Sequence, residues 1–490
     1  MAWLVIILYC FSLFAIFLFA LVQFSLGLNY IRSRIKRKKE PQKCEELSEL
    51  PFVTIQLPLF NEKYVVKRLL DSVSKLNYPK DKYEVQILDD STDETTEILK
   101  DELPKYQEQG FDYKLVLREN RIGFKAGALD YGLHNAKGEF IAIFDADFVI
   151  NPEFLHKTLW CFNDPEIGLV QTRWEHLNRN HSLLTKLQAF ALDGHFSVEQ
   201  VGRNFGAHFI NFNGTAGIWR KKTIIDAGGW EHDTLTEDLD LSYRAQLKDW
   251  RFIYLEEVEA PAELPMAISA LKSQQFRWTK GGAENFVKLF PKLLFSKGIP
   301  FKHRLHGLAH LFNSSVYLFV FLAALMSVPL ISVVKMDESY ANLIRFTSIF
   351  FVSTGFLMFY YWLSFRENYS NGLVKFFAFT FRFLQFLSVS LGMSFYNTKA
   401  VLMAYAGKKT PFVRTPKFNF LSEKKDWKLN SYLAKNLRFS TLVEGLLCLY
   451  FVFGIVYGIV NGMYGMIAFH SLLALGFGTV FIYTVTERKL

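Results

Sequence analysis

The chain has 490 residues, of which 50% are hydrophobic and 17% aromatic, and its formal net charge is +9. This length allows two or three domains, and an aromatic excess that includes 50 Phe is typical of chains with membrane segments. The charge does not predict nucleic-acid binding, because the basic residues gather beside uncharged runs, where anionic lipid attracts them. The four Cys lack the spacing of a zinc site or a disulfide framework.

The N-terminal run of residues 1–31 carries no charged side chain, and a basic cluster follows it at 32–39. The run exceeds the roughly 20 residues that cross a hydrocarbon core, and it lacks the cleavage site of a signal peptide. We therefore expect a transmembrane helix over 1–31 and a basic linker over 32–49. Because Lys and Arg favour the cytoplasmic side, the N-terminus should lie outside and the following region in the cytosol.

Between residues 50 and 260, short runs rich in β-branched and aromatic residues alternate with segments of helical apolar spacing, such as 65–76 and 126–136. This alternation predicts an α/β domain over 50–283, with a mostly parallel sheet and flanking helices. In such domains ligands bind beyond the carboxyl ends of the strands. The predicted strands are 52–57, 83–88, 113–117, 140–144, 168–172 and 250–255.

The C-terminal part is dominated by long apolar runs. Residues 376–403 form one of them, but Arg382 and Lys399 interrupt it. A charged side chain at mid-bilayer costs roughly 2.5 kcal/mol or more, so we expect an amphipathic helix in the membrane interface. This assignment leaves the basic segment 404–440 in the cytosol. The other expected elements are interfacial helices over 284–310, spans over 311–334 and 346–365, and two spans over 441–486 joined by a turn at Asn461–Gly462.

Acidic residues follow two of the predicted strands. Asp89 ends one strand, and Asp145 and Asp147 end another, where side chains two residues apart point the same way. Paired carboxylates repel unless a cation lies between them, and Mg²⁺ typically takes one or two carboxylates together with substrate phosphates. The pattern indicates a site for a divalent metal and a diphosphate, although an Asp-x-Asp sequence alone would also fit a turn.

Thr236-Glu237-Asp238 precedes an amphipathic helical pattern and allows two interpretations. In one, the three residues cap the helix, because Thr accepts free amide hydrogens and acids favour the positive end of the helix dipole. In the other, Asp238 is a general base that the helix start holds ionised by depressing its pKa. The two interpretations are compatible.

Gln274, Arg277 and Trp278 lie on one face of a further predicted helix. Arg offers a rigid donor fork for phosphate oxygens, and Trp presents a flat apolar face on which a pyranose ring can lie. A Trp near a membrane is also a common interface anchor. Together the three side chains indicate a site for a sugar diphosphate beside the membrane.

In their order along the chain, these motifs resemble the inverting glycosyltransferases of family 2, and specifically membrane-embedded polysaccharide synthases of the cellulose synthase and glucomannan synthase kind. The resemblance covers roughly residues 50–420. Its matching stretches are Pro58–Glu62, Asp89, Lys125–Gly127, Asp145–Asp147, Gln171–Trp174, Phe212–Gly217, Thr236–Asp238, Gln274–Trp278 and Phe412–Lys417.

The resemblance implies a GT-A-like nucleotide-sugar-binding fold on a bundle of transmembrane helices, and it implies a role for each matching residue. Asp238 would be the catalytic base, and Asp147 with Asp145 would hold Mg²⁺ or Mn²⁺. The donor would contact Asp89, Lys125, Asp145, Gln274 and Arg277. The acceptor would contact Trp278, Asn213, Gly214 and Thr215, and a gating loop over 412–417 would contribute Phe412, Arg414, Thr415 and Lys417.

The implied function is transfer of a hexose from UDP-glucose or GDP-mannose to a growing β-glycan, which the membrane helices help to guide outward. The implied partners are the nucleotide sugar, a glycan or lipid acceptor, membrane lipids and subunits of an export path. A single transfer to a membrane lipid is an alternative, and a non-catalytic membrane scaffold is a second one. The sequence leaves open the sugar, the nucleotide and the linkage. One compact chain with few Cys favours a bacterial inner membrane.

Overall fold

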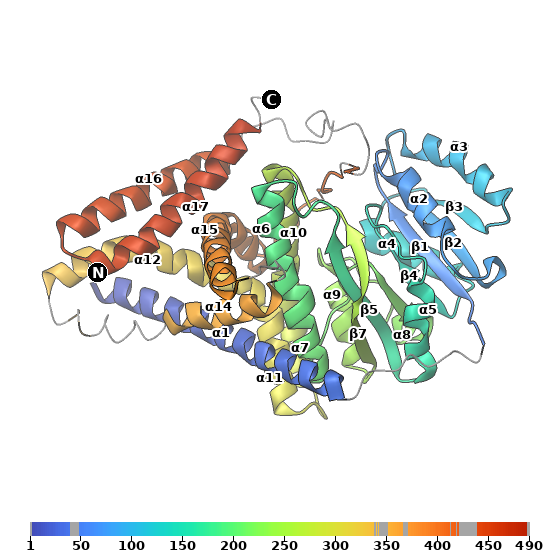
Figure 1. Cartoon of the computed structure of the whole chain (residues 1–490), viewed down its shortest axis with the longest axis horizontal. Helices are drawn as coiled ribbons and strands as arrows, with labels where there is room; N and C mark the ends of the chain where they lie inside the picture. The colour runs from blue at the N-terminus through green and yellow to red at the C-terminus, as the bar shows by residue number, and fades with distance from the viewer. Residues whose placement is uncertain are drawn as a thin grey trace.

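The chain forms a sheet-containing domain beside a group of long helices (Figure 1). The computed structural model describes residues 2–39, 49–337, 340, 342, 351–365, 371–411, 413–417, 419–420 and 439–487. The strands are β1 (Val53–Leu59), β2 (Tyr83–Asp89), β3 (Tyr113–Leu117), β4 (Phe140–Ile143), β5 (Ile167–His176), β6 (Gly217–Arg220) and β7 (Arg251–Ala262). The helices of the sheet domain are α2 (Val66–Ser74), α3 (Thr95–Gln107), α4 (Phe124–His134), α5 (Phe154–Leu159), α8 (Lys221–Asp226) and α9 (Glu237–Gln246).

The sheet has seven strands in the order β3-β2-β1-β4-β6-β5-β7. Every neighbouring pair is parallel except the two that β6 makes with β4 and β5. The predicted mostly parallel sheet is therefore confirmed, and all six predicted strands are present. The sequence did not predict β6, because its four residues GIWR contain only two apolar side chains, whereas the equally short β4 is the continuous apolar run FIAI.

Helices cover both faces of the sheet. Apolar side chains of α2, α3 and α5 pack against one face, and those of α4, α8 and α9 pack against the other. Strand residues alternate between the two layers, so that Ile55 and Ala142 belong to the first and Ile141 and Ile143 to the second. This arrangement leaves the carboxyl ends of the parallel strands at one edge, which faces the long helices (Figure 1).

Two helices lie between the sheet and the long helices in Figure 1: α6 (Leu183–Asp193) and α10 (Ile268–Leu294). A π-helical turn, η3 (Gly194–Glu199), joins α6 to α7 (Gln200–Phe205). The predicted end of the catalytic domain at residue 283 falls inside α10, which continues to Leu294. The remaining helices are α1 (Ala2–Lys39), α11 (Phe301–Phe312), α12 (Val316–Met336), α14 (Val352–Ser364), α15 (Gly372–Tyr405), α16 (Phe439–Val460) and α17 (Ile467–Thr486), and short 3-10 turns lie at 80–82, 160–163, 313–315 and 464–466.

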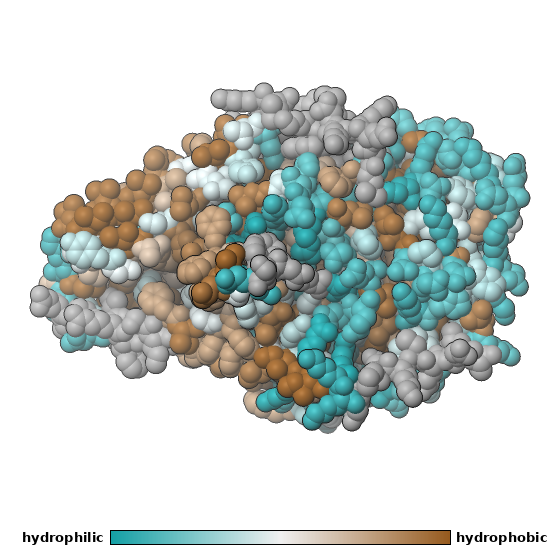
Figure 2. Space-filling model, viewed as in Figure 1, coloured by the Kyte–Doolittle hydropathy of each residue, from teal (hydrophilic) through white to brown (hydrophobic). Residues whose placement is uncertain are grey.

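Within the described residues, five helical segments are long and apolar enough to cross a membrane, by length and composition. They are Ala2–Lys39, Phe301–Met336, Gly372–Tyr405, Phe439–Val460 and Tyr464–Thr486. Figure 2 shows hydrophobic residues gathered over the long helices and hydrophilic residues over the sheet domain. The predicted turn at Asn461–Gly462 lies between α16 and α17, where Gly462 has a positive φ of 72°.

The helix α15 qualifies as a span by length and composition, although the sequence predicts an interfacial helix there. In Figure 1 this helix is seen nearly end-on, whereas α1, α12, α16 and α17 run across the page. The interfacial position stays a prediction, as do the other domain boundaries. Most of the predicted cytosolic segment 404–440, including residues 421–438, lies outside the described residues.

Candidate active site

A cavity of about 200 Å³ lies at the carboxyl ends of the strands, between the sheet and α10. Its walls include residues at or just after the carboxyl ends of β1, β2, β4, β5 and β7, the first turn of α9 and one face of α10. The sequence-predicted site residues that line it are Lys125, Asp145, Asp147, Asn213, Gly214, Asp238, Gln274, Arg277, Trp278, Arg414, Thr415 and Lys417. Asp89 and Thr215 are described but do not line the cavity, and Phe412 lies outside the described residues.

Asp145 and Asp147 lie in a turn that follows β4, and not on the strand itself. The strand ends at Ile143, which is the last residue that pairs with β6, and the N–H of Phe148 donates to the carbonyl of Asp145 at 3.2 Å. The expectation that strand alternation aligns the two carboxylates is therefore wrong. The turn nevertheless places both of them on the wall of the same cavity.

Lys125 lies at the start of α4 and faces Asp145. Its Nζ is 2.5 Å from Asp145 Oδ1 and donates to the carbonyl of Gly214 at 2.7 Å. Burial lowers the pKa of this ammonium, but Asp145, Glu237 and Asp238 together outweigh burial and raise the pKa above its ordinary value. A charged ammonium is thus held at the cavity wall, where it can contact a phosphate oxygen.

Asp147 is 2% exposed, and its two carboxylate oxygens have different surroundings. Oδ2 lies 2.7 Å from the ammonium of Lys417, whereas Oδ1 is buried without a hydrogen-bond partner among the described residues. A buried carboxylate oxygen is costly unless a donor or a cation satisfies it. Oxygen is also the ligand that Mg²⁺ prefers. The residues present therefore fit a divalent ion, which Asp147 and Asp145 would hold.

Asp238 lies in the first turn of α9, and its Oδ1 accepts a hydrogen bond from the N–H of Leu239 at 2.8 Å. Burial and the neighbouring Glu237 carboxylate raise its pKa to about 7, since they outweigh the backbone donors and Lys125. The expected depressed pKa is therefore wrong, because desolvation exceeds the effect of the helix start. A value near neutrality suits a general base.

Thr236 precedes α9, but its side chain forms no capping hydrogen bond in the described structure. Instead, the side-chain amide of Asn285 on α10 donates to Thr236 Oγ1 at 2.8 Å and to the Thr236 carbonyl at 2.9 Å. These contacts fix the start of α9 against α10. The base and the Gln274–Trp278 face are thereby held in one rigid unit.

Gly214 allows the backbone to pass close to Asp238. Its φ is +78°, and a Cβ atom built on it would lie 3.0 Å from Asp238 Oδ2 and 3.5 Å from Lys125 Nζ. A side chain at this position would be strained by the backbone and would press on the carboxylate. The glycine thus keeps the oxygen of Asp238 open to the cavity.

The segment 413–417 lies against the cavity and is joined to three of its walls. Arg277 Nη2 donates to Thr415 Oγ1 at 3.2 Å, and Arg414 Nε donates to Glu62 Oε1 at 2.9 Å. Burial raises the pKa of Glu62 to about 7, against the opposing effect of Arg414. Together with the contact of Lys417 on Asp147, these bonds hold the segment across the cavity.

The side chain after β2 that lines the cavity is Asp90, and not Asp89. Asp89 is 3% exposed, and its oxygens accept from the N–H of Ser91 at 3.0 Å and from the hydroxyl of Thr96 at 2.6 Å. Asp90 lines the cavity and accepts from Arg118 Nε at 2.9 Å. Adjacent residues of an extended chain point to opposite sides, so the sequence shows that one of the two reaches the cavity but not which one. Three further lining residues have no role predicted from the sequence, namely Glu62, His176 and Glu263, and Glu237 was predicted only to cap α9.

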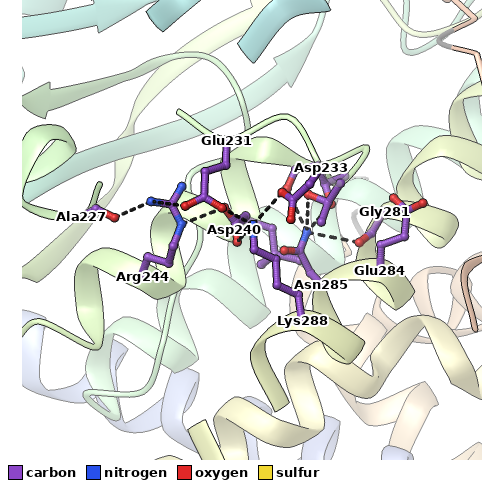
Figure 3. A network of polar contacts seen from close by, with 12 residues as sticks. Ala227, Glu231, Asp233, Asp240, Arg244, Gly281, Glu284, Asn285 and Lys288 are labelled. Carbon is purple, nitrogen blue, oxygen red and sulfur yellow. Dashed lines mark hydrogen bonds and ion pairs between the residues drawn. The ribbon is translucent and has the colours of Figure 1, made fainter. Parts of the chain in front are cut away.

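A second group of acids lies beside the cavity and is drawn in Figure 3. One oxygen each of Glu231, Asp233 and Asp240 lie within 4.8 Å of one another, which is a spacing that a metal ion could use. The ammonium of Lys288 lies 2.6, 2.6 and 3.0 Å from these three carboxylates. Lys288 on α10 thus supplies the positive charge that balances the three carboxylates. The cluster links α10 to Asp240 on α9 and to Glu231 and Asp233 in the chain before α9.

Residues 51–281 match a family model described as "Glycosyltransferase like family 2". Glucomannan 4-beta-mannosyltransferase 1 of Cyamopsis tetragonoloba is 42% identical over 54% of this chain and 51% of its own length. Glucomannan 4-beta-mannosyltransferase 2 of Arabidopsis thaliana is 42% identical over 52% of this chain and 49% of its own length. The chain thus spans about half the length of these curated relatives.

Among solved structures, a mannosyltransferase from Pyrobaculum calidifontis in complex with GDP-Man and Mn²⁺ shares the fold, with a TM-score of 0.54. It is 18% identical and covers 81% of this chain and 100% of its own. The resemblance found in the sequence motifs is therefore confirmed. Residues 51–281 thus match the model of glycosyltransferase family 2 and have a GT-A-like fold, and over about half its length the chain is similar to the glucomannan 4-beta-mannosyltransferases.

Proposed function

We propose that the chain is a metal-dependent inverting glycosyltransferase that transfers a hexose from a nucleotide diphosphate sugar to a growing β-glycan. The observation that carries this proposal is the single cavity in which Asp147, Asp238 and Trp278 meet, although they come from three separate elements. A non-catalytic scaffold would have no chemical need to bring these side chains together. The family 2 domain supports the same reaction class.

We propose GDP-mannose as the donor and keep UDP-glucose as the alternative. The curated relatives are named as mannosyltransferases, and the solved neighbour is a complex with GDP-Man. In the cavity, the ammonium of Lys125 and the guanidinium of Arg277 provide positive charge for a diphosphate. A divalent ion held by Asp147 and Asp145 would add charge neutralisation on the leaving diphosphate.

In the proposed reaction, Asp238 removes the proton from an acceptor hydroxyl while Lys125 and Arg277 stabilise the negative charge that develops on the departing diphosphate. The acceptor oxygen attacks from the side opposite the leaving group, so an α-linked donor yields a β-linked product. The pKa of about 7 lets Asp238 exist largely as the carboxylate at a slightly alkaline pH while remaining basic enough to accept the proton.

A second cavity of about 170 Å³ favours a glycan acceptor over a membrane lipid. It shares Leu192, Gln274 and Trp278 with the first cavity and extends toward the long helices. Aromatic rings can stack on sugar faces, and amides and hydroxyls can bond sugar hydroxyls. Groups of these kinds from α6, α10, α12, α14 and α15 line it: Gln188, Gln275, Tyr317, Tyr361, Ser390 and Asn397. We propose that the glycan passes from Trp278 into this cavity.

We also propose that the chain is an integral membrane protein with the sheet domain in the cytosol and the N-terminus outside. The long apolar helices support a membrane protein, and the basic residues at the end of α1 support this orientation. The relatives reported above are plant proteins, so the bacterial location expected from the sequence has no support among them. Membrane lipids and subunits of an export path remain the proposed partners.

The test is to incubate the purified full chain in lipid nanodiscs with Mn²⁺ and radiolabelled GDP-mannose, UDP-glucose and other nucleotide sugars. The proposal expects a polymer that a β-linkage-specific endoglycosidase digests. A product of a single sugar on a lipid would favour the alternative acceptor. An absence of both transfer and donor hydrolysis with every nucleotide sugar would refute the proposal and favour a scaffold.

A further inference from the structure

Asn213 lines the cavity, and its side-chain amide contacts three residues that, in the described structure, do not line it. Asn213 Nδ2 lies 3.1 Å from His195 Nε2, and Asn213 Oδ1 accepts from Gln200 Nε2 at 2.8 Å and from Asn211 Nδ2 at 3.3 Å. The backbone N–H of the same residue donates to Gln171 Oε1 at 2.9 Å. The backbone and the amide of Asn213 are thus fixed separately.

The orientation of this amide depends on a chain of contacts that begins at Glu199. Glu199 is 5% exposed, and its Oε1 accepts from Arg203 Nε at 3.0 Å and from Nη2 at 2.8 Å. Its Oε2 lies 3.1 Å from His195 Nδ1. Burial alone would raise the pKa of Glu199, but Arg203 and His195 outweigh burial and hold the pKa below its ordinary value. Glu199 is therefore a carboxylate and can only accept hydrogen bonds.

A carboxylate at Glu199 fixes the roles of the two ring nitrogens of His195. Nδ1 must carry the hydrogen that is donated to Glu199, so in the neutral ring Nε2 is an acceptor. Asn213 must then direct an N–H toward Nε2, and its Oδ1 faces the two amide donors on the other side. One N–H of the Asn213 amide is used in this way, and the second N–H of this cavity-lining residue is left for another acceptor.

The local backbone explains why His195 and Glu199 meet. Both residues lie in the π-helical turn η3, which widens the helix between α6 and α7. Such turns are often found at functional sites. At Gly194 a Cβ atom would lie 2.8 Å from the ring of Tyr361 and 2.9 Å from the ring of Tyr360, so this turn packs closely on α14. The position of His195 is thereby fixed by the packing of η3 on α14.

Asn213 also neighbours the proposed base. The next residue is Gly214, whose Cβ position would lie 3.0 Å from Asp238 Oδ2. In the proposed function, this base receives the proton of the acceptor hydroxyl. Asn213 and Asp238 line the same cavity, so a donor N–H of Asn213 is placed to reach an acceptor sugar whose hydroxyl approaches Asp238.

We propose that His195 is a positioning residue that, through its contact with Glu199, orients the amide of Asn213 so that an N–H is offered to a hydroxyl of the acceptor sugar. This inference rests on the proposed function, because it requires an acceptor sugar beside Asp238. It adds a residue that touches neither donor nor acceptor and that controls affinity for the acceptor alone.

The test is a double-mutant cycle with His195→Ala, Asn213→Ala and the double variant in the full chain. The measured quantities are kcat and KM for a β-1,4-linked manno-oligosaccharide acceptor and KM for GDP-mannose. Each single substitution should raise the acceptor KM by about fivefold, as expected for one neutral hydrogen bond, and should leave the GDP-mannose KM unchanged. The double variant should equal the single Asn213→Ala variant, because His195 acts through Asn213. His134→Ala changes an exposed residue at the end of α4 and serves as the matched control.

Two further variants keep the test decisive. His195→Phe retains a ring but lacks both nitrogens, so it replaces the Ala variant in the cycle if that variant does not fold. His195→Gln offers a carbonyl oxygen to Asn213 and should restore part of the acceptor affinity. Additive effects of the two substitutions, or an equal rise in the GDP-mannose KM, would overturn the role of His195 while donor turnover still supports the proposed function. Lack of turnover by the unsubstituted chain would overturn both.

Discussion

Replacing Asp238 with Asn tests the proposed base through stability and activity together. Burial and Glu237 raise the pKa of this carboxyl from 3.8 to about 7. In free energy this difference corresponds to at most about 4 kcal/mol. Because the pKa is higher in the folded than in the unfolded chain, folding is not penalised at a pH below 3.8, and the penalty is complete above a pH of about 7. Asn carries no charge, so the variant should be more stable than the unsubstituted chain under alkaline conditions.

The assay compares thermal unfolding midpoints of the two proteins in the same nanodiscs at about pH 5 and about pH 8. The Asp238→Asn variant should unfold at a higher temperature at the alkaline pH, and its advantage should shrink as the pH falls. Its rate of transfer should drop by roughly 10²- to 10⁴-fold, the usual contribution of a general base, while its affinity for the donor stays unchanged. For the unsubstituted chain, kcat/KM should rise with pH through about 7.

Asp101→Asn is the matched control, because Asp101 is exposed on α3 and does not line the cavity. This substitution should change neither the unfolding temperature nor the transfer rate. Retained turnover in the Asp238→Asn variant would refute the role of Asp238 as the base. A variant that is less stable than the unsubstituted chain at the alkaline pH would refute the argument from burial.

Three further substitutions probe the cavity. Gly214→Ala should lower the stability by about 1–2 kcal/mol, because alanine disfavours the left-handed backbone at this position. It should also slow transfer, because the added Cβ presses on Asp238, and normal turnover would contradict this account. Lys417→Gln removes the ammonium that contacts Asp147, where it competes with a metal ion for the carboxylate. The variant should therefore bind Mn²⁺ more tightly, as measured by the electron paramagnetic resonance signal of the ion. Unchanged or weaker binding would contradict this competition. Trp278→Ala should raise the KM of a manno-oligosaccharide acceptor much more than the KM of GDP-mannose, and an equal rise in both would argue against stacking on the acceptor.

The sequence was most informative where chemistry and secondary-structure period coincide. Gln274, Arg277 and Trp278 were placed on one helix face, and α10 does present all three to the cavity. The period of strands and helices likewise predicted the parallel part of the sheet, because buried strands give continuous apolar runs. The antiparallel strand β6 has only two apolar residues in its sequence GIWR and gave no such signal.

The features that could not be predicted depend on the residue at which a strand ends and on how deeply a side chain is buried. Asp145 and Asp147 converge through a turn because β4 stops at Ile143, and the sequence does not mark that end. The pKa of Asp238 depends on the surrounding desolvation, which is a property of the packed cavity. The contact of His195 with Asn213 requires the π-helical turn η3, which has no distinct residue signature here.

The most direct measurement is a structure of the full chain with Mn²⁺ and a non-hydrolysable analogue of GDP-mannose. We predict that the diphosphate lies between Lys125 and Arg277, with the ion on Asp147 and the sugar facing Asp238. A nucleotide bound outside this cavity, or an ion bound away from Asp147, would contradict the central claim that these strand ends and α10 form one glycosyl-transfer site.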